Sequence, residues 1–105
     1  MSSVETAQVF AALGDPTRLA LLTRLSDGED RSIAALSADT GLTRQGVTKH
    51  LAVLEGAGLV AHSRQGRETR FRYRPEPVAQ AMAHLDAISA QWDAAIGRLK
   101  AFVED

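Results

Sequence analysis

The sequence predicts a mainly α-helical fold that carries one small β-hairpin. Apolar residues recur every three or four positions through most of the chain, which is the period of an amphipathic helix. From Leu59 to Arg74 they instead alternate with polar residues, as they do along a strand. The chain has 105 residues, of which 45% are apolar and 24% charged, so we expect a single domain over residues 1–105 with one modest core.

The first two helices are marked by their end signals. The first begins near Val4 and stops at Gly14, because glycine often terminates a helix. Asp15 is placed to accept hydrogen bonds from the first amides of the second helix, and Pro16 suits its first turn. Leucines recur along the second helix at helical spacing and form the side expected to face the core: Leu19, Leu22 and Leu25.

Two further helices follow closely. Ser32 is the expected cap of a short third helix over 33–38, which stops at a glycine. Thr43 is the expected cap of a fourth helix over about 43–56. A short helix, a turn with a glycine and a second helix have the spacing of a helix-turn-helix, here over about 32–56.

A β-hairpin over about 59–74 comes next. Its turn is predicted at Gln65-Gly66. In the second strand Phe71 and Tyr73 lie on one side, and three arginines lie on the other: Arg70, Arg72 and Arg74. The hairpin therefore has a basic face.

The last predicted element is a long helix over about 76–103. Its apolar side chains step by three and four residues without interruption, at Val78, Ala81, Leu85, Ile88, Trp92, Ala95, Leu99 and Phe102. A heptad stripe of this length exceeds what a small domain needs for its own core, so it predicts a subunit interface. The alternative is that this helix packs only against the first helices of its own chain.

Charge is unevenly distributed along the chain. Residues 44–74 hold seven basic and two acidic residues, a net charge of +5, whereas the whole chain has a formal net charge of −1. A basic segment in an otherwise acidic chain indicates a surface that binds a polyanion.

The exposed side of the fourth helix carries groups suited to DNA. With Val47 at the centre of the buried side, a turn of about 100° per residue puts Gln45 and Lys49 on the opposite side. Thr48 lies on the flank and Arg44 in the first turn. Glutamine can pair with adenine, and arginine or lysine with guanine. A merely solvated surface is the alternative, but the absence of acidic residues around these positions disfavours it.

Together these elements predict a winged helix-turn-helix with about five helices and a two-stranded wing over about 59–74. In this arrangement the fourth helix enters the major groove of DNA and the hairpin follows the backbone. The candidate DNA-binding residues are Thr43, Arg44, Gln45, Thr48, Lys49, His50, Arg64, Arg67, Arg70 and Arg72. For His50, a packed position at the boundary of the core is an equal alternative.

Three stretches resemble the ArsR/SmtB family of bacterial transcriptional repressors: "FAALGDPTRLALLTRL" (10–25), "GLTRQGVTKHLAVLEGAGLV" (41–60) and "RQGRETRFRY" (64–73). The resemblance implies a homodimer that binds double-stranded DNA at an inverted-repeat operator and represses its own or a neighbouring operon. It also implies dimerisation through the first and last helices, in agreement with the heptad stripe. The interface residues expected on this basis are Val9, Leu85, Ile88, Trp92, Leu99 and Phe102.

The chain departs from the metal-sensing members of that family. The resemblance would place metal-binding cysteines on the third helix, or His and Asp/Glu pairs on the last one. This chain has no cysteine, and His50, His62 and His84 are too scattered for a metal site. We therefore expect the metal-independent branch, with no metal and no cofactor, and with an effector that the sequence does not name. The alternative is a metal site built across the dimer from His84, Asp86 and Glu104.

Other functional classes have less support. No glycine-rich phosphate loop, paired-carboxylate pocket or nucleophile turn indicates an enzyme. The chain shows no membrane-spanning run and no leader, so we expect a cytoplasmic protein without membrane contact. A winged-helix module that binds proteins stays open as an alternative, which the basic wing disfavours.

Overall fold

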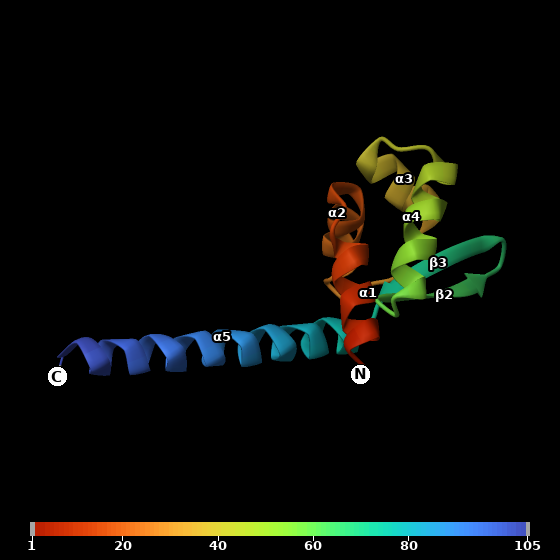
Figure 1. Ribbon diagram of the computed structural model, residues 1–105. Helices are drawn as coiled ribbons and strands as arrows, with labels where there is room; N and C mark the ends of the chain where they lie inside the picture. The colour runs from red at the N-terminus through yellow and green to blue at the C-terminus, as the bar shows by residue number, and fades with distance from the viewer. Residues whose placement is uncertain (1, 105) are drawn as a thin grey trace.

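The computed structural model describes residues 2–104, which form five helices and three antiparallel strands. In chain order the elements are α1 (Ser3–Leu13), α2 (Pro16–Leu25), β1 (Arg31–Ser32), α3 (Ile33–Thr40), α4 (Arg44–Gly56), β2 (Val60–Gln65), β3 (Glu68–Tyr73) and α5 (Glu76–Glu104). The helices α1 to α4 and the sheet make up a body, and α5 leaves it as a single long helix (Figure 1). The principal dimensions are therefore 69 × 26 × 22 Å. This confirms the mainly α-helical fold with a small wing.

Three helices begin at the caps that the sequence predicts. The side chains of Asp15, Ser32 and Thr43 accept hydrogen bonds of 3.0, 3.1 and 3.0 Å from backbone amides three residues later. Pro16 lies in the first turn of α2. Gly41, after α3, has a φ of 71°, which glycine adopts without strain. These local signals fix where α3 ends and where α4 begins.

The core lies between α1, α2, α3, α4 and the sheet, and the first turns of α5 close it. Val47, Leu51 and Leu54 of α4 are each 0% exposed, which confirms the predicted buried side of this helix. On α2 the expectation for Leu19 is wrong, because this side chain is 50% exposed whereas Leu21 is fully buried. With about 100° of turn per residue, Leu21 and the later leucines share one side of α2, and Leu19 lies beyond its edge.

The three strands pair in the order β1-β3-β2. The strands β2 and β3 form the predicted wing, with Gln65 opposite Glu68. The turn occupies Gly66 and Arg67, one residue later than predicted. The strand β1 was not predicted; it has two residues and pairs with the middle of β3. Two residues are too few to show an alternating pattern.

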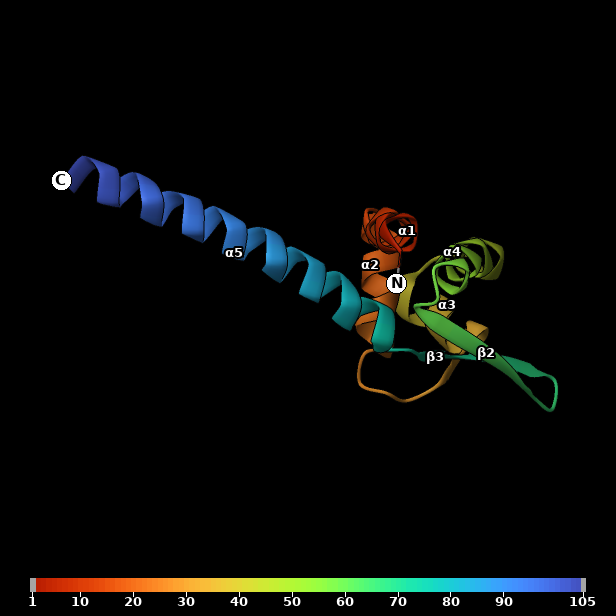
Figure 2. The ribbon, with the colours of Figure 1, turned by 60° about the horizontal axis from the view of Figure 1, so that its bottom comes forward.

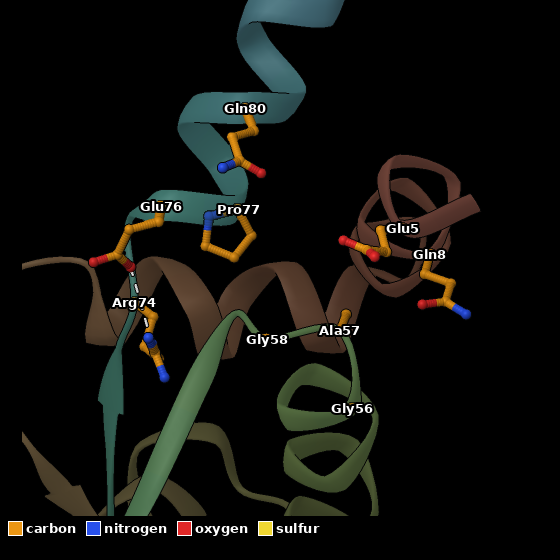
Figure 3. A pocket seen from close by; sticks show the side chains of 9 residues that line it. All are labelled: Glu5, Gln8, Gly56, Ala57, Gly58, Arg74, Glu76, Pro77 and Gln80. Atoms are coloured by element: carbon orange, nitrogen blue, oxygen red, sulfur yellow. Dashed lines mark ion pairs between the residues drawn. The ribbon is translucent and has the colours of Figure 1, made fainter. Parts of the chain in front are cut away.

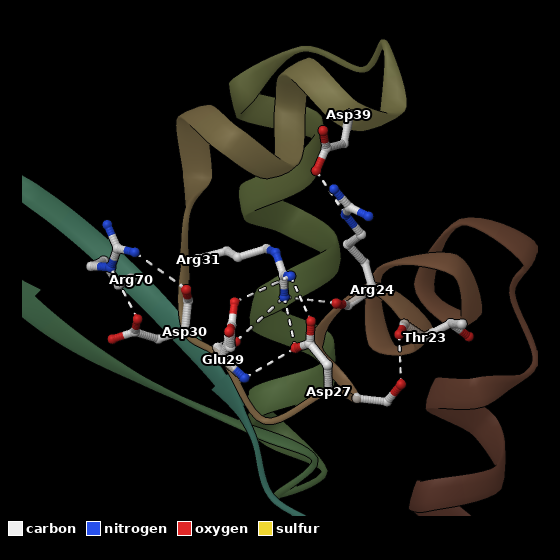
Figure 4. A network of polar contacts seen from close by, with 9 residues as sticks. Thr23, Arg24, Asp27, Glu29, Asp30, Arg31, Asp39 and Arg70 are labelled. Atoms are coloured by element: carbon white, nitrogen blue, oxygen red, sulfur yellow. Dashed lines mark hydrogen bonds and ion pairs between the residues drawn. The ribbon is translucent and has the colours of Figure 1, made fainter.

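Ion pairs hold the loop before β1 to its surroundings (Figure 4). Asp27 and Arg31 are joined by an Oδ2–Nη2 contact of 2.6 Å. Arg31 also donates a hydrogen bond of 2.8 Å to the carbonyl oxygen of Arg24, near the end of α2. Asp30 lies 3.4 Å from the guanidinium of Arg70 on β3. The loop is thereby tied both to α2 and to the wing.

Only the first turns of α5 contact the body. Val78 is half-buried and Ala81 is buried, but from residue 82 to 104 every side chain except that of Ala95 is exposed. Packing of the whole stripe against the same chain is therefore excluded. Val9, expected in a subunit interface, is 1% exposed because it lies on the side of α1 that faces the core. This part of the expectation does not fit the structure. Within residues 2–104, no helix combines the length and apolar character that crossing a bilayer requires.

Replacing Leu21 by alanine should lower the free energy of unfolding by about 2–5 kcal/mol, because the loss of a fully buried side chain leaves a cavity. Leu19→Ala, on the same helix, should change it by less than about 0.5 kcal/mol, because that side chain is exposed. Urea unfolding of both variants at one protein concentration measures the two values. Equal losses would contradict this packing of α2.

Acid should weaken the pair formed by Asp27 and Arg31. The hydrogen bond from the Arg31 guanidinium, helped by the backbone amide of Glu29, holds the pKa of Asp27 well below its ordinary value of 3.8. The folded protein then binds fewer protons than the unfolded chain, so this stabilisation is complete above about pH 4 and is lost as the pH falls further. Asp27→Asn lacks it throughout.

The urea midpoints of the wild type and of Asp27→Asn should therefore differ near pH 7, and the difference should shrink steadily as the pH falls below about 4. A difference that stays constant over this range would show that the carboxylate charge contributes nothing.

Candidate nucleic-acid interface

The exposed side of α4 carries the polar residues that the sequence singles out. Arg44, Gln45, Thr48 and Lys49 are all exposed, and Val47 is buried beneath them. The hydroxyl of Thr48 donates a hydrogen bond of 2.7 Å to the carbonyl oxygen of Arg44, so it has only an acceptor left to offer. The side chains of Arg44, Gln45 and Lys49 remain as donors.

Thr43 and Gly46 share the start of α4. The Oγ1 atom of Thr43 accepts the amide of Gly46 at 3.0 Å, and because Thr43 is exposed its hydroxyl hydrogen stays available to an anion. A Cβ added at Gly46 would lie 3.2 Å from this Oγ1, which is tighter than ordinary contact. The glycine therefore leaves room for the cap.

The wing projects from the body on the side away from α5. Both ribbon views show the β2–β3 hairpin and α5 extending in opposite directions, with α3 and α4 on the same side as the wing (Figures 1 and 2). An elongated partner could thus contact α4 and the wing without meeting α5.

Strand register divides the wing arginines between two faces. Arg64 pairs with Thr69 and His62 with Phe71, so Arg64 lies on the same face as the buried Phe71, which is the face toward α4. Arg70 and Arg72 lie on the opposite face, as the sequence pattern predicts. Only the first of these two faces is the one toward α4.

Glu55 joins the end of α4 to the wing. Its carboxylate accepts the backbone amide of His62 at 2.9 Å and lies 2.6 Å from the His62 Nδ1 atom. The His62 ring lies 5.8 Å from that of Phe71, measured between centroids. This contact fixes the direction of the wing relative to α4. It could not be found from sequence, where Glu55 is simply an acidic residue in a basic segment.

Most arginines of the body are engaged within the protein. They are Arg18 with the carbonyl oxygens of Ala11 and Ala12, Arg24 with Asp39, Arg31 with Asp27, Arg70 with Glu68 and Asp30, and Arg74 with Glu76. The remaining cations of residues 44–74 form no ion pair with any residue from 2 to 104: Arg44, Lys49, Arg64, Arg67 and Arg72. A cation without a carboxylate partner can bind an external anion without first breaking a charged hydrogen bond.

Two of the predicted DNA-binding residues have internal partners. Arg70 is held by Glu68 at 2.9 Å and by Asp30 at 3.4 Å. His50 is half-buried, with its Nδ1 atom 3.8 Å from the carboxylate of Asp15, which caps α2. The structure therefore places His50 at the boundary between α4 and α2, and it places Arg72 beside a different hollow near the start of α5.

The other end of α4 meets α1 and α5 at a hollow of about 400 Å³ (Figure 3). Its lining includes Glu5, Glu76 and Arg74, and the last two lie 3.9 Å apart. Gly58 follows α4 with a φ of 77°, and a Cβ added there would lie 3.5 Å from Pro77 of α5. Carboxylates at this end disfavour a polyanion, so the candidate interface comprises the first half of α4 and the wing.

Metal-binding residues do not gather in the described part of the chain. Within residues 2–104, no group of three His, Cys, Asp or Glu side chains is close enough together to hold a metal ion. The candidate ligands His84 and Asp86 are on the exposed part of α5.

The chain is similar to known helix-turn-helix proteins. A family described as a helix-turn-helix domain matches residues 13–63. The HTH-type transcriptional regulator CmtR of Mycobacterium tuberculosis is 39% identical over 79 residues, which cover 75% of this chain and 66% of that protein, so the chain spans just under two thirds of this relative. The probable mercury resistance operon repressor of Streptomyces lividans is 34% identical over 91 residues, which cover 87% of this chain and 72% of that protein.

Several solved structures share the fold. An ArsR-like transcriptional regulator from Rhodococcus sp. RHA1 has a TM-score of 0.81 and 38% identity, covering 92% of this chain and 91% of that one. The homodimeric winged helix-turn-helix DNA-binding domain of Mb0332 from Mycobacterium bovis, a possible ArsR-family regulator, has a TM-score of 0.66 and 29% identity, covering 83% and 80%.

Proposed function

The chain belongs to the ArsR family of winged helix-turn-helix transcriptional regulators, and from this premise we propose that it is a homodimeric, sequence-specific DNA-binding repressor of its own or a neighbouring operon, acting in the cytoplasm. The family is not an enzyme class. The observation that carries the proposal is the group of cations on α4 and the wing that form no ion pair with any residue from 2 to 104.

The proposed reading element is the first half of α4. Its exposed side offers Gln45 and Lys49 as donors, which suit adenine and guanine edges in the major groove, while Arg44 in the first turn suits a backbone phosphate. Thr43, at the helix start, suits a backbone phosphate. In a symmetric dimer two such helices enter successive major grooves about 34 Å apart, which requires an inverted-repeat operator.

The proposed wing contacts are fewer than the sequence indicates. Arg64 faces toward α4 and Arg67 is in the turn, and neither has an internal partner among residues 2–104. We leave out Arg70, because its guanidinium is bound by two carboxylates, and Arg72, because it lies on the opposite face. His50 is left out because it packs beside Asp15.

The proposed dimer interface is the apolar side of α5. Large side chains along 29 residues of helix are exposed in the single chain, among them Leu85, Ile88, Trp92, Leu99 and Phe102. Burial of such a surface is favourable, and an unaccompanied helix of this kind is marginal in water. The homodimeric state of the Mycobacterium bovis domain supports this assembly.

We further propose that the protein does not respond to metal ions. The chain has no cysteine, and thiolates are the ligands that soft metals prefer. The alternative is a metal site built across the dimer from His84, Asp86 and Glu104. The Streptomyces lividans relative, named as a probable mercury resistance operon repressor, is the reason to test this alternative. A second alternative is a module that binds another protein. Such a role would not require the cations of α4 and the wing that form no ion pair with residues 2–104, so these cations favour DNA.

Fluorescence anisotropy with the DNA upstream of its own gene, beside scrambled DNA at several salt concentrations, tests the proposed function. We expect tight, salt-dependent binding that scrambled DNA does not match. Lys49→Ala should weaken binding and reduce the slope of log K against log salt by about one, because one phosphate or base-edge cation is lost. Arg72→Ala removes the same charge from the other face of the wing and should leave affinity unchanged.

Weak and equal binding to the upstream and the scrambled DNA would mean that the operator lies outside the tested upstream sequence. No binding to any duplex at low salt would contradict the proposal and favour a protein partner. Equal losses for Lys49→Ala and Arg72→Ala would contradict the assigned face.

The single tryptophan reports the proposed dimer. Trp92 is 67% exposed in the single chain, so its emission should move to shorter wavelength when a partner buries it and move back on dilution. Leu99→Glu should weaken the dimer by more than about tenfold, because it buries a charge. Ala101→Glu, on the opposite side of α5, is the matched control and should leave the dimer intact. Analytical ultracentrifugation of both variants and of the wild type measures their mass in solution. A monomeric wild type would contradict the proposed dimer.

A further inference from the structure

We propose that the hollow between α3, α4 and the wing is a seat for one backbone phosphate, which Arg44 and Arg67 bind jointly. The inference rests on the proposed DNA-binding function and identifies the group of DNA that this site takes. The hollow has a volume of about 290 Å³, and its lining includes Ile33, Ala34, Arg44, Thr48, Arg67 and Thr69.

Three separate elements meet at this hollow. Ile33 and Ala34 are the first residues of α3, and Arg44 and Thr48 are one turn apart at the start of α4. Arg67 is in the wing turn. A ligand here touches the recognition helix, the helix before it and the wing at the same time. No single one of these elements forms the hollow by itself.

The electrostatics of the hollow favour an anion. Arg44 and Arg67 are exposed and form no ion pair within residues 2–104. The positive end of the α3 dipole adds to their field, since α3 begins at Ile33. Glu68 also lines the hollow, but its carboxylate is neutralised by Arg70 at 2.9 Å, and strand alternation puts Glu68 on the face away from α4.

Thr69 supplies the hydroxyl donor. Its side chain shares the α4-facing side of the wing with Arg64 and makes no hydrogen bond with the described residues. Two other hydroxyls line the hollow: that of Thr48 donates to the carbonyl oxygen of Arg44, and that of Ser32 accepts the amide of Ala35 as the cap of α3. Two guanidinium groups and the Thr69 hydroxyl around a concave site suit a phosphodiester, whose two unesterified oxygens accept several hydrogen bonds.

Joint binding of one phosphate differs measurably from binding of two. If Arg44 and Arg67 share a phosphate, removing both arginines loses one phosphate contact, and the slope of log K against log salt falls by about 0.9. If they bind separate phosphates, the slope falls by about 1.8. The free-energy effects of the two substitutions are then additive, whereas shared binding makes them non-additive.

The test is a double-mutant cycle of Arg44→Ala and Arg67→Ala, measured by anisotropy on the duplex that the wild type prefers. We expect each single variant to bind DNA about tenfold more weakly, as for the loss of a charged hydrogen bond. The loss of affinity in the double variant should be smaller than the product of the two single losses. Thr69→Val should weaken binding several-fold. The matched control is the cycle of Lys49→Ala and Arg64→Ala, which lie outside the hollow and should be additive.

The outcomes separate this inference from the proposed function. Suppose the wild type prefers one duplex, but the effects of Arg44→Ala and Arg67→Ala are additive and the slope changes by about 1.8. This result overturns the shared phosphate site and leaves the proposed function intact. Failure of the wild type to prefer any duplex overturns the proposed function. Circular dichroism of the variants establishes that they fold.

A second arm distinguishes the DNA backbone from free phosphate as the ligand. Inorganic phosphate is titrated into the preformed complex against chloride at equal ionic strength. We expect the two salts to act alike, since the seat takes a phosphodiester positioned by the duplex. Stronger displacement by phosphate, abolished in the double variant, would make the free ion the ligand and overturn the assignment.

Discussion

The burial of one side of α4 is the constraint on which the rest of the interface depends. Val47, Leu51 and Leu54 are fully buried, and α4 packs against α1, α2, α3 and β2, so the helix cannot rotate about its axis. Its polar residues are therefore presented in one fixed direction. At the end of the same helix, Glu55 holds the first strand of the wing. One packed helix thus determines both where its own donors point and where the wing arginines lie.

Much of this organisation can be read from local sequence. Caps at Asp15, Ser32 and Thr43 are single-residue signals whose physics acts within one turn, and each lies where expected. The hairpin is equally visible, because alternation and a glycine turn are local. The strand β1 is not, since a two-residue strand exists only through its pairing with β3.

The candidate site is predicted less completely than the fold, because it depends on contacts between distant residues. Asp30 and Arg70 are 40 positions apart, and nothing near either one indicates that they meet. Register likewise decides that Arg64 shares a face with Phe71. The sequence supplies a basic segment, but only the folded chain separates its arginines into those bound internally and those left for a partner. The same holds for Leu19 and Val9, whose exposure depends on which side of each helix packs inward.

The length of α5 has a consequence for the life of the protein in the cell. A lone copy presents large apolar side chains along most of a helix that touches nothing else. Without a partner such a helix opens readily, and opened, apolar chain is what proteases cleave and chaperones retain. If α5 forms the proposed dimer, assembly and protection from proteolysis are linked through mass action, because dilution exposes this helix as well as separating the subunits. The concentration of such a dimer would fall more steeply than the total concentration of the chain when synthesis slows.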